Sequence, residues 1–347
     1  MVGNAIPHGV PACADNRLRG SLQFGHPCCL PRIAGVAVGN LPFGTAITLA
    51  KTVLAMVTID SPYRDQGTWL RGNVHTHSTN SDGIRDPQDV ANDYAARGYD
   101  FLAISDHDTF THPEEYETAA LIEIPAVEVS VNGPHILHLG ATTAVEPDAD
   151  RAAVLQSISE TEGFAVPAHP NWEPHFDHWP QDELSRIDGY TGIEIYNGLV
   201  EHHPGAAIAT DRWDQLLSAG RRVWGFANDD SHRPWDVANG WNVVQVDEPT
   251  RESVLAALSG GRFYASTGIT ITAISTSDGI VTIDTENADE IRLVSDHGVI
   301  QQIVSGTEAT FRVPEQLVHA GPEFTYIRLE CYGRGNERAW TQPMFLE

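Results

Sequence analysis

The sequence predicts an α/β fold followed by a small all-β domain, and three observations support this prediction. Short apolar runs alternate with helical segments from residue 68 to about residue 265. After Thr267 the helical pattern stops, and the apolar residues alternate in period two. Residues 1–55 are rich in Pro, Gly and Cys and hold a single acidic residue, Asp15. We therefore expect a disordered or spurious leader over 1–55, with Met56 a plausible start, an α/β domain over 68–265 and a small antiparallel β-sandwich domain over 266–347.

The elements of the α/β part follow one another in a regular order. Asp86 can cap a helix whose first position suits Pro87. Later helical segments end in glycine, which favours helix termination. The expected strands cover 72–78, 101–108, 124–130, 135–140, 164–170, 192–197 and 224–230, and the expected helices cover 86–98, 112–122, 148–163, 211–220 and 250–261.

This alternation of strands and helices is typical of an α/β barrel or sheet with parallel strands. In such folds the chemistry gathers at the carboxyl ends of the strands. Here the His, Asp and Glu residues lie mostly at those ends, so we expect a site there.

Charge and cysteine content exclude several classes of protein. The net charge of −26 argues against binding of a nucleic-acid polymer, because phosphate binding needs a basic surface. The four cysteines form no CxxC pair, which argues against a zinc finger or a redox motif. The apolar stretch 33–55 is interrupted by Asn40, Pro42 and Lys51, so no membrane span is expected. A cytoplasmic protein follows, although 1–55 could be a targeting segment, and the oligomeric state stays open.

The motif GNVHTHSTNSDG contains the first metal-ligand candidates. His75 and His77 are two residues apart on a strand, so both imidazoles point to one face and can bind one ion. Asp82 follows in a turn that can bring a carboxylate back over the strand end. A lone HxH motif is weak evidence, but the rest of the chain repeats the pattern.

Further ligand candidates end or interrupt other apolar runs. Glu128 follows an apolar run, where a buried glutamate needs a cation or a partner. Asp230 and His232 repeat the i, i+2 spacing of the first pair. Taken alone, His138 and His169 are ambiguous, and the joint pattern favours them. The complete set of expected ligands is His75, His77, Asp82, His107, Glu128, His138, His169, Asp230 and His232.

Imidazole and carboxylate ligands suit zinc, manganese or iron. One ion seldom takes more than four to six protein ligands, so nine candidates favour two ions and allow three. We therefore predict a multinuclear site of divalent cations.

The motifs HTHSTNSDG, ISDHD, VEVS, ILHLG, PAHP and NDDSH resemble those of the PHP (polymerase and histidinol phosphatase) phosphoesterases, in family order over residues 73–232. The resemblance implies a distorted seven-stranded β/α barrel with three metal ions. It leaves residues 1–67 uncovered, and the carboxyl-terminal sandwich lies outside the family's core motifs. Many family members have histidine where this chain has Asp82, and the SDG variant resembles the branch that acts on small phosphomonoesters, including nucleotides.

Carried over by position, the resemblance implies three groups of ligands, with Glu128 shared. The first ion would be held by His75, His77, Glu128 and Asp230, the second by Asp82, His107 and His232, and the third by Glu128, His138 and His169.

The ligand pattern predicts a metal-dependent hydrolase, and the resemblance implies a phosphoesterase that acts on a small phosphomonoester, either a nucleotide or a phosphorylated metabolite. A metal-bridging water or hydroxide would be the nucleophile. Arg233 is the candidate for phosphate contact, since a guanidinium can bind two oxygens at once. Asp108, or one histidine among His175, His178 and His202, could protonate the leaving group.

Two alternatives stay open. The first is a metal-dependent hydrolase of a non-phosphate substrate, as in barrel amidohydrolases. These usually carry a carbamylated lysine, whereas Lys51, the only lysine of the chain, lies outside the predicted barrel. The second is a non-catalytic module with a structural metal site. Structural zinc sites are typically thiolate-rich and closed, which the His/Asp/Glu set does not match.

Overall fold

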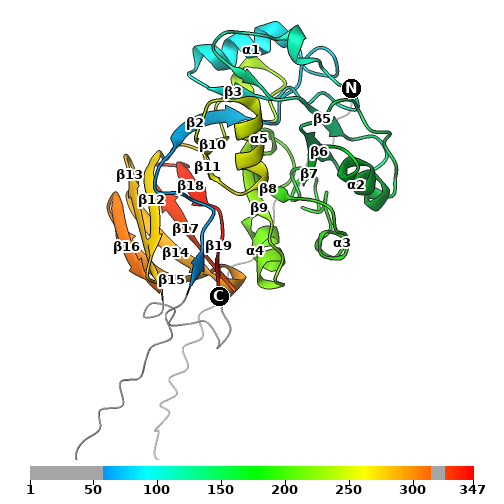
Figure 1. Cartoon of the computed structure of the whole chain (residues 1–347). Coiled ribbons are helices and arrows are strands. Elements are labelled where there is room, and N and C mark those ends of the chain that lie inside the picture. The colour runs from blue at the N-terminus through cyan, green and yellow to red at the C-terminus, as the bar shows by residue number, and fades with distance from the viewer. Residues whose placement is uncertain (1–57, 314–324) are drawn as a thin grey trace, which may run out of the picture. The chain divides into compact units, whose positions relative to one another are not determined.

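The computed structural model describes residues 58–313 and 325–347 (Figure 1). The predicted leader over 1–55 lies outside the described residues, with Cys13, Cys28 and Cys29. Within the described ranges no helix is long and apolar enough to cross a membrane.

The helices of the described ranges are short, and several begin at capping residues. Helix α1 (Pro87–Ala96) starts where the sequence predicts it, because the Asp86 carboxylate accepts a hydrogen bond from the Asp89 backbone N–H at 2.9 Å. Asp150 caps α2 in the same manner. The further α-helices described are α2 Arg151–Ser159, α3 Gln181–Arg186, α4 Thr210–Ser218 and α5 Arg251–Ser259.

The helix expected over 112–122 is not present. One 3-10 turn, Pro113–Glu115, forms in its place. The backbone N–H of Leu121 then donates to the carbonyl of Thr118, and this turn redirects the chain into the next strand.

The strands of the α/β part divide among three sheets. Their bounds are β2 Thr68–Asn73, β3 Phe101–Leu102, β4 Ile122–Glu123, β5 Ala126–Val129, β6 Ile136–Leu139, β7 Phe164–Pro167, β8 Gly192–Asn197 and β9 Trp224–Asn228. β2, β3 and β4 pair in parallel, as do β8 and β9. β5, β6 and β7 pair antiparallel instead. The α/β class is confirmed, but the expectation of parallel strands fails for β5 to β7.

The reason for the antiparallel pairing of β5 with β6 is the length of their connection. Only residues 130–135 separate them, and a parallel crossover needs about a dozen residues or more. The chain must therefore turn back directly.

The ladders of these sheets do not form the closed barrel that the resemblance implied. Isolated parallel bridges connect the sheets instead. Two of them join residues at strand ends, Thr76 with Ser231 and His107 with Glu128. Residues far apart in the sequence are brought together at these bridges, and most of them belong to or adjoin the expected metal ligands.

From β10 onward, the paired strands of the described residues are antiparallel, as predicted for the chain after Thr267. Their bounds are β10 Trp241–Val246, β11 Phe263–Ser266, β12 Ile271–Ser277, β13 Ile280–Thr285, β14 Glu290–Ser295, β15 Val299–Ser305, β16 Glu308–Arg312, β17 Tyr326–Tyr332, β18 Arg338–Thr341 and β19 Met344–Leu346. β10 pairs with β2, and β11 pairs with both β10 and β18. One sheet therefore runs across the predicted domain boundary at 265/266.

The carboxyl-terminal strands form two layers. β12, β13 and β16 make a separate three-stranded sheet, whereas β14, β15, β17, β18 and β19 belong to the large sheet (Figure 1). Val281 and Phe311 from the first sheet and Leu293 and Leu329 from the second lie in one buried cluster. The two sheets share an apolar core, which covers one face of each.

Candidate metal centre

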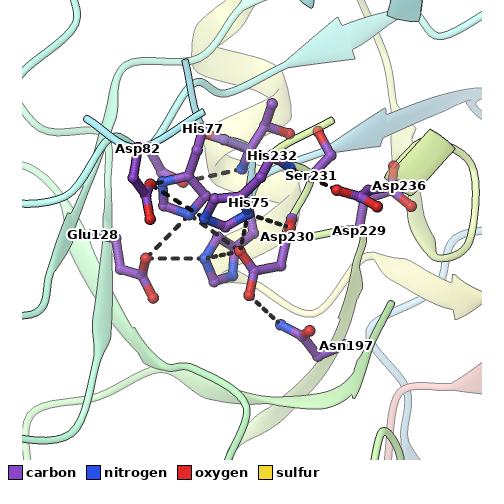
Figure 2. Close-up of polar contacts among 12 residues, drawn as sticks. His75, His77, Asp82, Glu128, Asn197, Asp229, Asp230, Ser231, His232 and Asp236 are labelled. Carbon is purple, nitrogen blue, oxygen red and sulfur yellow. Dashed lines mark hydrogen bonds and ion pairs between the residues drawn. The ribbon is translucent and has the colours of Figure 1, made fainter. Parts of the chain in front are cut away.

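The two histidines that follow β2 point the same way, as their spacing predicts (Figure 2). Both side chains are fully buried, and their Nε2 atoms approach the same two carboxylates. His75 Nε2 lies 3.2 Å from Glu128 Oε2 and 3.3 Å from Asp230 Oδ1. His77 Nε2 lies 3.2 Å and 3.1 Å from the same atoms. Three separate strand ends thus converge on one point.

The four atoms at this point fit a divalent cation. All are buried, and none has a hydrogen-bond partner among the described residues: His75 Nε2, His77 Nε2, Glu128 Oε2 and Asp230 Oδ1. Such orphaned atoms would each cost roughly 1–3 kcal/mol without another partner. Nitrogen and oxygen ligands about 2.0–2.2 Å from one ion lie roughly 3.0–3.5 Å from each other, which matches the observed separations. A metal ion accounts for both their position and their lack of partners.

The backbone is strained where it delivers two of these side chains. Asp230 has φ 53° and His169 has φ 31°, the left-handed region that non-glycine residues seldom adopt. The backbone N–H of Asp230 donates to the His75 carbonyl at 3.0 Å, which fixes the first of these turns against the strand end.

A second group of possible ligands forms around Asp82, which is half-exposed. Its carboxylate lies 3.2 Å from His232 Nε2, 3.7 Å from His107 Nε2 and 3.8 Å from His77 Nδ1. Burial raises the pKa of Asp82, but contact with His232 and the charges of His77 and His107 outweigh this and hold the pKa well below its usual range. The carboxylate is therefore ionised and available to a cation.

A third group uses the other oxygen of Glu128. Its Oε1 lies 3.0 Å from His135 Nδ1 and 3.2 Å from His169 Nε2. Glu128 therefore lies between the groups, as the resemblance implied for a shared ligand. His178 adjoins this third group, but its Nε2 accepts a hydrogen bond from the His135 backbone N–H and its Nδ1 lies 2.9 Å from Glu173.

Both ring nitrogens of His178 are thus engaged. Burial, together with the adjacent His169 and His135, lowers the pKa of His178 to about 2. The imidazole stays neutral, so His178 does not fit the proton-donor role that the sequence allowed.

The expected ligand His138 lies away from the groups. In the β5–β6 ladder Glu128 pairs with Leu137, so these two side chains share a face, as does His135 two residues before Leu137. His138 is on the opposite face, where its Nε2 contacts Thr161 Oγ1 at 3.1 Å. The prediction for His138 is corrected, and His135, from the same HILHLG motif, takes its place.

The sequence interpretation also missed Glu194, at the centre of β8. This buried carboxylate contacts His75 Nδ1 at 2.7 Å and accepts from the His169 backbone N–H at 2.8 Å. Side-chain amides of Asn228 and Asn197 donate to it at 2.7 and 3.0 Å. A hydrogen at Nδ1 leaves the His75 Nε2 lone pair free for a metal, so Glu194 orients the ligand. The signal was present, since GIEIYN carries a glutamate inside an apolar strand.

The two aspartates that flank His107 stabilise neighbouring turns through hydrogen bonds. Asp106 is buried and accepts from the Ser78 backbone N–H at 2.7 Å and from Ser81 Oγ at 2.6 Å, so it shapes the turn before Asp82. Asp108 accepts from the backbone N–H groups of Ser130 and Val131, both at 3.0 Å, and from the Ser130 hydroxyl at 2.6 Å. Its oxygens are committed to the turn after β5, which contradicts the prediction of Asp108 as a catalytic acid.

Arg233 lines a cavity of about 300 Å³ that adjoins the ligand groups. Its backbone N–H donates to Asp236, but none of the described carboxylates pairs with its guanidinium, which lies 5.9 Å from the Trp235 ring. The exposed His175 and His202 are not among the described residues that line the cavity, whereas His203 is. The placement of Arg233 agrees with contact to a substrate anion.

Comparison with known families gives one match in the sequence, to the family described as PHP-associated, over residues 218–263. This segment contains Asp230 and His232. Over this segment, the match confirms the resemblance to the PHP family that the motifs indicate.

Among curated proteins, a 5'-3' exoribonuclease of Haemophilus influenzae is 41% identical to the chain over 75 residues. The match covers 19% of this chain and 27% of that protein, so the chain spans only about a quarter of the relative's length.

Solved structures give fold likenesses of low identity. A two-domain protein with a predicted PHP-like metal-dependent phosphoesterase, from Bacteroides vulgatus, matches with a TM-score of 0.49 and 16% identity, over 83% of this chain and 89% of that one. A lesion-specific endonuclease of Pyrococcus furiosus matches with a TM-score of 0.39 and 15% identity, over 56% of each chain.

Proposed function

We propose that this protein is a metal-dependent phosphoesterase that hydrolyses a small phosphomonoester. The observation that carries the proposal is the set of orphaned, buried nitrogen and oxygen atoms that converge beside an open cavity. A purely structural site would be closed by its own ligands. Here Asp82, His107 and His232 line the cavity, so a substrate can reach the ligand groups.

The residues that would hold the ions fall into the three groups described. Divalent ions bound there would lower the pKa of a bound water and neutralise phosphoryl oxygens. The ligand types suit manganese, zinc or iron, and the three groups would hold three ions, with Glu128 contributing to more than one group.

The chain's own side chains supply the remaining roles. The Arg233 guanidinium, which has no described carboxylate partner, binds phosphoryl oxygens. Since Asp108 and His178 make other contacts, we assign proton donation to the leaving alkoxide to His203, and its presence in the cavity lining supports this role. The net charge of −26 supports a small substrate over a nucleic-acid polymer.

The likeness to an exoribonuclease over 75 residues favours a second candidate, removal of nucleotides from the 5' end of RNA. The two candidates differ in the substrate required. Turnover of mononucleotides and p-nitrophenyl phosphate supports the first, whereas turnover of short RNA alone supports the second.

Hydrolysis of p-nitrophenyl phosphate with added manganese tests the proposal. We expect hydrolytic activity that is lost on chelation. Asp230→Ala should reduce this activity on the order of 1000-fold, because several kcal/mol of charge stabilisation are lost. Asp284→Ala, a change at an exposed aspartate of β13, is the control and keeps full activity. Chelation-sensitive activity that survives in Asp230→Ala would contradict the ligand assignment. Bound metal without any hydrolysis would favour the non-catalytic module, and turnover of non-phosphate esters or amides alone would favour the amidohydrolase alternative.

A further inference from the structure

Most of the side chains that line the cavity beside the metal-ligand groups are of two kinds. The first kind is the ligands themselves, including Asp82, Glu128 and Asp230. The second kind is apolar and comes from segments far apart in the sequence: Ile84, Trp172, Leu199 and Val200. A volume of about 300 Å³ is at the lower end of small-molecule sites. A phosphoryl group at the ligands leaves the apolar side chains for the rest of the substrate.

Ile84 is the most informative of these apolar side chains. It is 60% exposed, although large aliphatic side chains in fixed positions are usually covered. Its backbone N–H donates to the His232 carbonyl at 3.0 Å, so the residue is tied to a predicted metal ligand. Trp172, on another segment, packs edge-on against His169 with ring centroids 5.1 Å apart. The backbone of Ile84 and the ring of Trp172 are thus each held against a residue of the ligand groups.

Polar groups are few among the non-ligand side chains that line the cavity. Of the described lining residues, Arg233 alone carries a permanent positive charge, and His203 is the other polar side chain apart from the ligand groups. One arginine suits one phosphate. A leaving group rich in hydroxyls would lose water against Ile84, Leu199 and Val200 without gaining hydrogen bonds, which is unfavourable.

We propose that this cavity selects phosphomonoesters whose leaving group presents an apolar face and carries no second phosphate. The inference rests on the proposed function and adds the substrate class. Sugar phosphates and bisphosphates are disfavoured by the same side chains. Apart from the ligand groups, the described lining residues offer only Arg233 and His203 as polar side chains, and they include no second arginine.

Binding of unreactive phosphonates to the manganese-loaded protein tests this inference without requiring turnover. The probes are 2-cyclohexylethylphosphonate and the phosphonate analogue of glucose 6-phosphate, measured by isothermal titration calorimetry. We expect the cyclohexyl probe to bind at least about 10-fold more tightly, since an apolar pocket discriminates by roughly 10- to 200-fold. Ile84→Asn should reduce this preference about 5-fold.

The matched control is Ile303→Asn, which changes an isoleucine of β15 that is 50% exposed and absent from the cavity lining. It should leave the preference unchanged. Equal affinity for both probes, or tighter binding of the sugar analogue, overturns the inference. A preserved preference with no hydrolysis of any phosphomonoester would overturn the proposed function and still support the selectivity of the cavity.

Discussion

Two clusters of buried charged side chains among the described residues are arranged in opposite ways. Between α4 and β17, the buried Arg328 pairs with Asp214 and with Glu330, at 2.6 Å from Nη2 to Glu330 Oε1. Tyr326 and Tyr332 donate their hydroxyls to the same carboxylates at 2.7 Å. In the metal centre, by contrast, buried nitrogens and oxygens face one another without hydrogen bonds.

The difference separates a structural network from a binding site. A buried ion pair with all its partners present holds elements together, and it is costly to break on one side. Orphaned atoms that converge on a point gain their stabilisation only when a ligand arrives. We therefore expect substitutions in the Arg328 network to change stability and substitutions in the metal centre to change metal affinity.

The largest expected effect is on stability. Arg328→Met leaves the buried Asp214 and Glu330 carboxylates without their cation, so the free energy of unfolding should fall by about 3–5 kcal/mol. Urea denaturation of the metal-free protein measures it. Asp182→Ala, which breaks the exposed pair with Arg186, should cost less than about 1 kcal/mol. A loss of metal content in the folded Arg328→Met protein would contradict the separation of the Arg328 network from the metal centre.

The next effect compares the two histidines of HILHLG. His135→Ala removes a side chain that contacts Glu128 Oε1 in the third ligand group. Few ligands remain in that group, so its affinity for a metal ion should fall on the order of 100-fold. His138→Ala changes a histidine on the opposite face and should retain every ion. Elemental analysis after dialysis distinguishes them. Equal metal content in the two variants would refute the exchange of His138 for His135.

A smaller change is expected at Glu194, which contacts His75 but belongs to none of the ligand groups. Glu194→Gln disturbs the hydrogen bond that orients His75, and loss of such a partner typically lowers metal affinity about 10- to 100-fold. Calorimetric titration with manganese measures this, and ¹⁵N shifts of His75 report its tautomer. Glu201→Gln, a change at an exposed glutamate, serves as the control. Unaltered affinity in Glu194→Gln would show that the contact does not orient the ligand.

The smallest effect concerns pH. Burial raises the pKa of Glu330, but the charge of Arg328 and the Tyr332 hydroxyl outweigh it and hold the pKa below its usual 4.5. Because the folded-state pKa is depressed, this stabilisation is present above pH 4.5 and is lost as pH falls below it. Glu330→Gln should therefore flatten the decline of Tm between pH 5 and about pH 3. The same slope in both proteins would rule out Glu330 as its source.

Much of the metal centre could be predicted because strand alternation is a local property. His75 and His77 share a face whatever their neighbours are, and in the structure both side chains approach the same Glu128 oxygen. The choice between His135 and His138 needed the register of β6 on β5, which the motif does not contain. Glu194 was visible as a glutamate in an apolar strand, but its partner, His75, lies 119 residues away.

The sequence by itself determined the alternating elements, the capped start of α1 and the ligand types, because these depend on side-chain chemistry and on periods within a few residues. Only the tertiary structure decided that β5 to β7 run antiparallel, that one sheet crosses residues 265/266 and that Asp108 serves a turn. These depend on which strand ends meet, and long-range pairing is set by the packing of the whole chain.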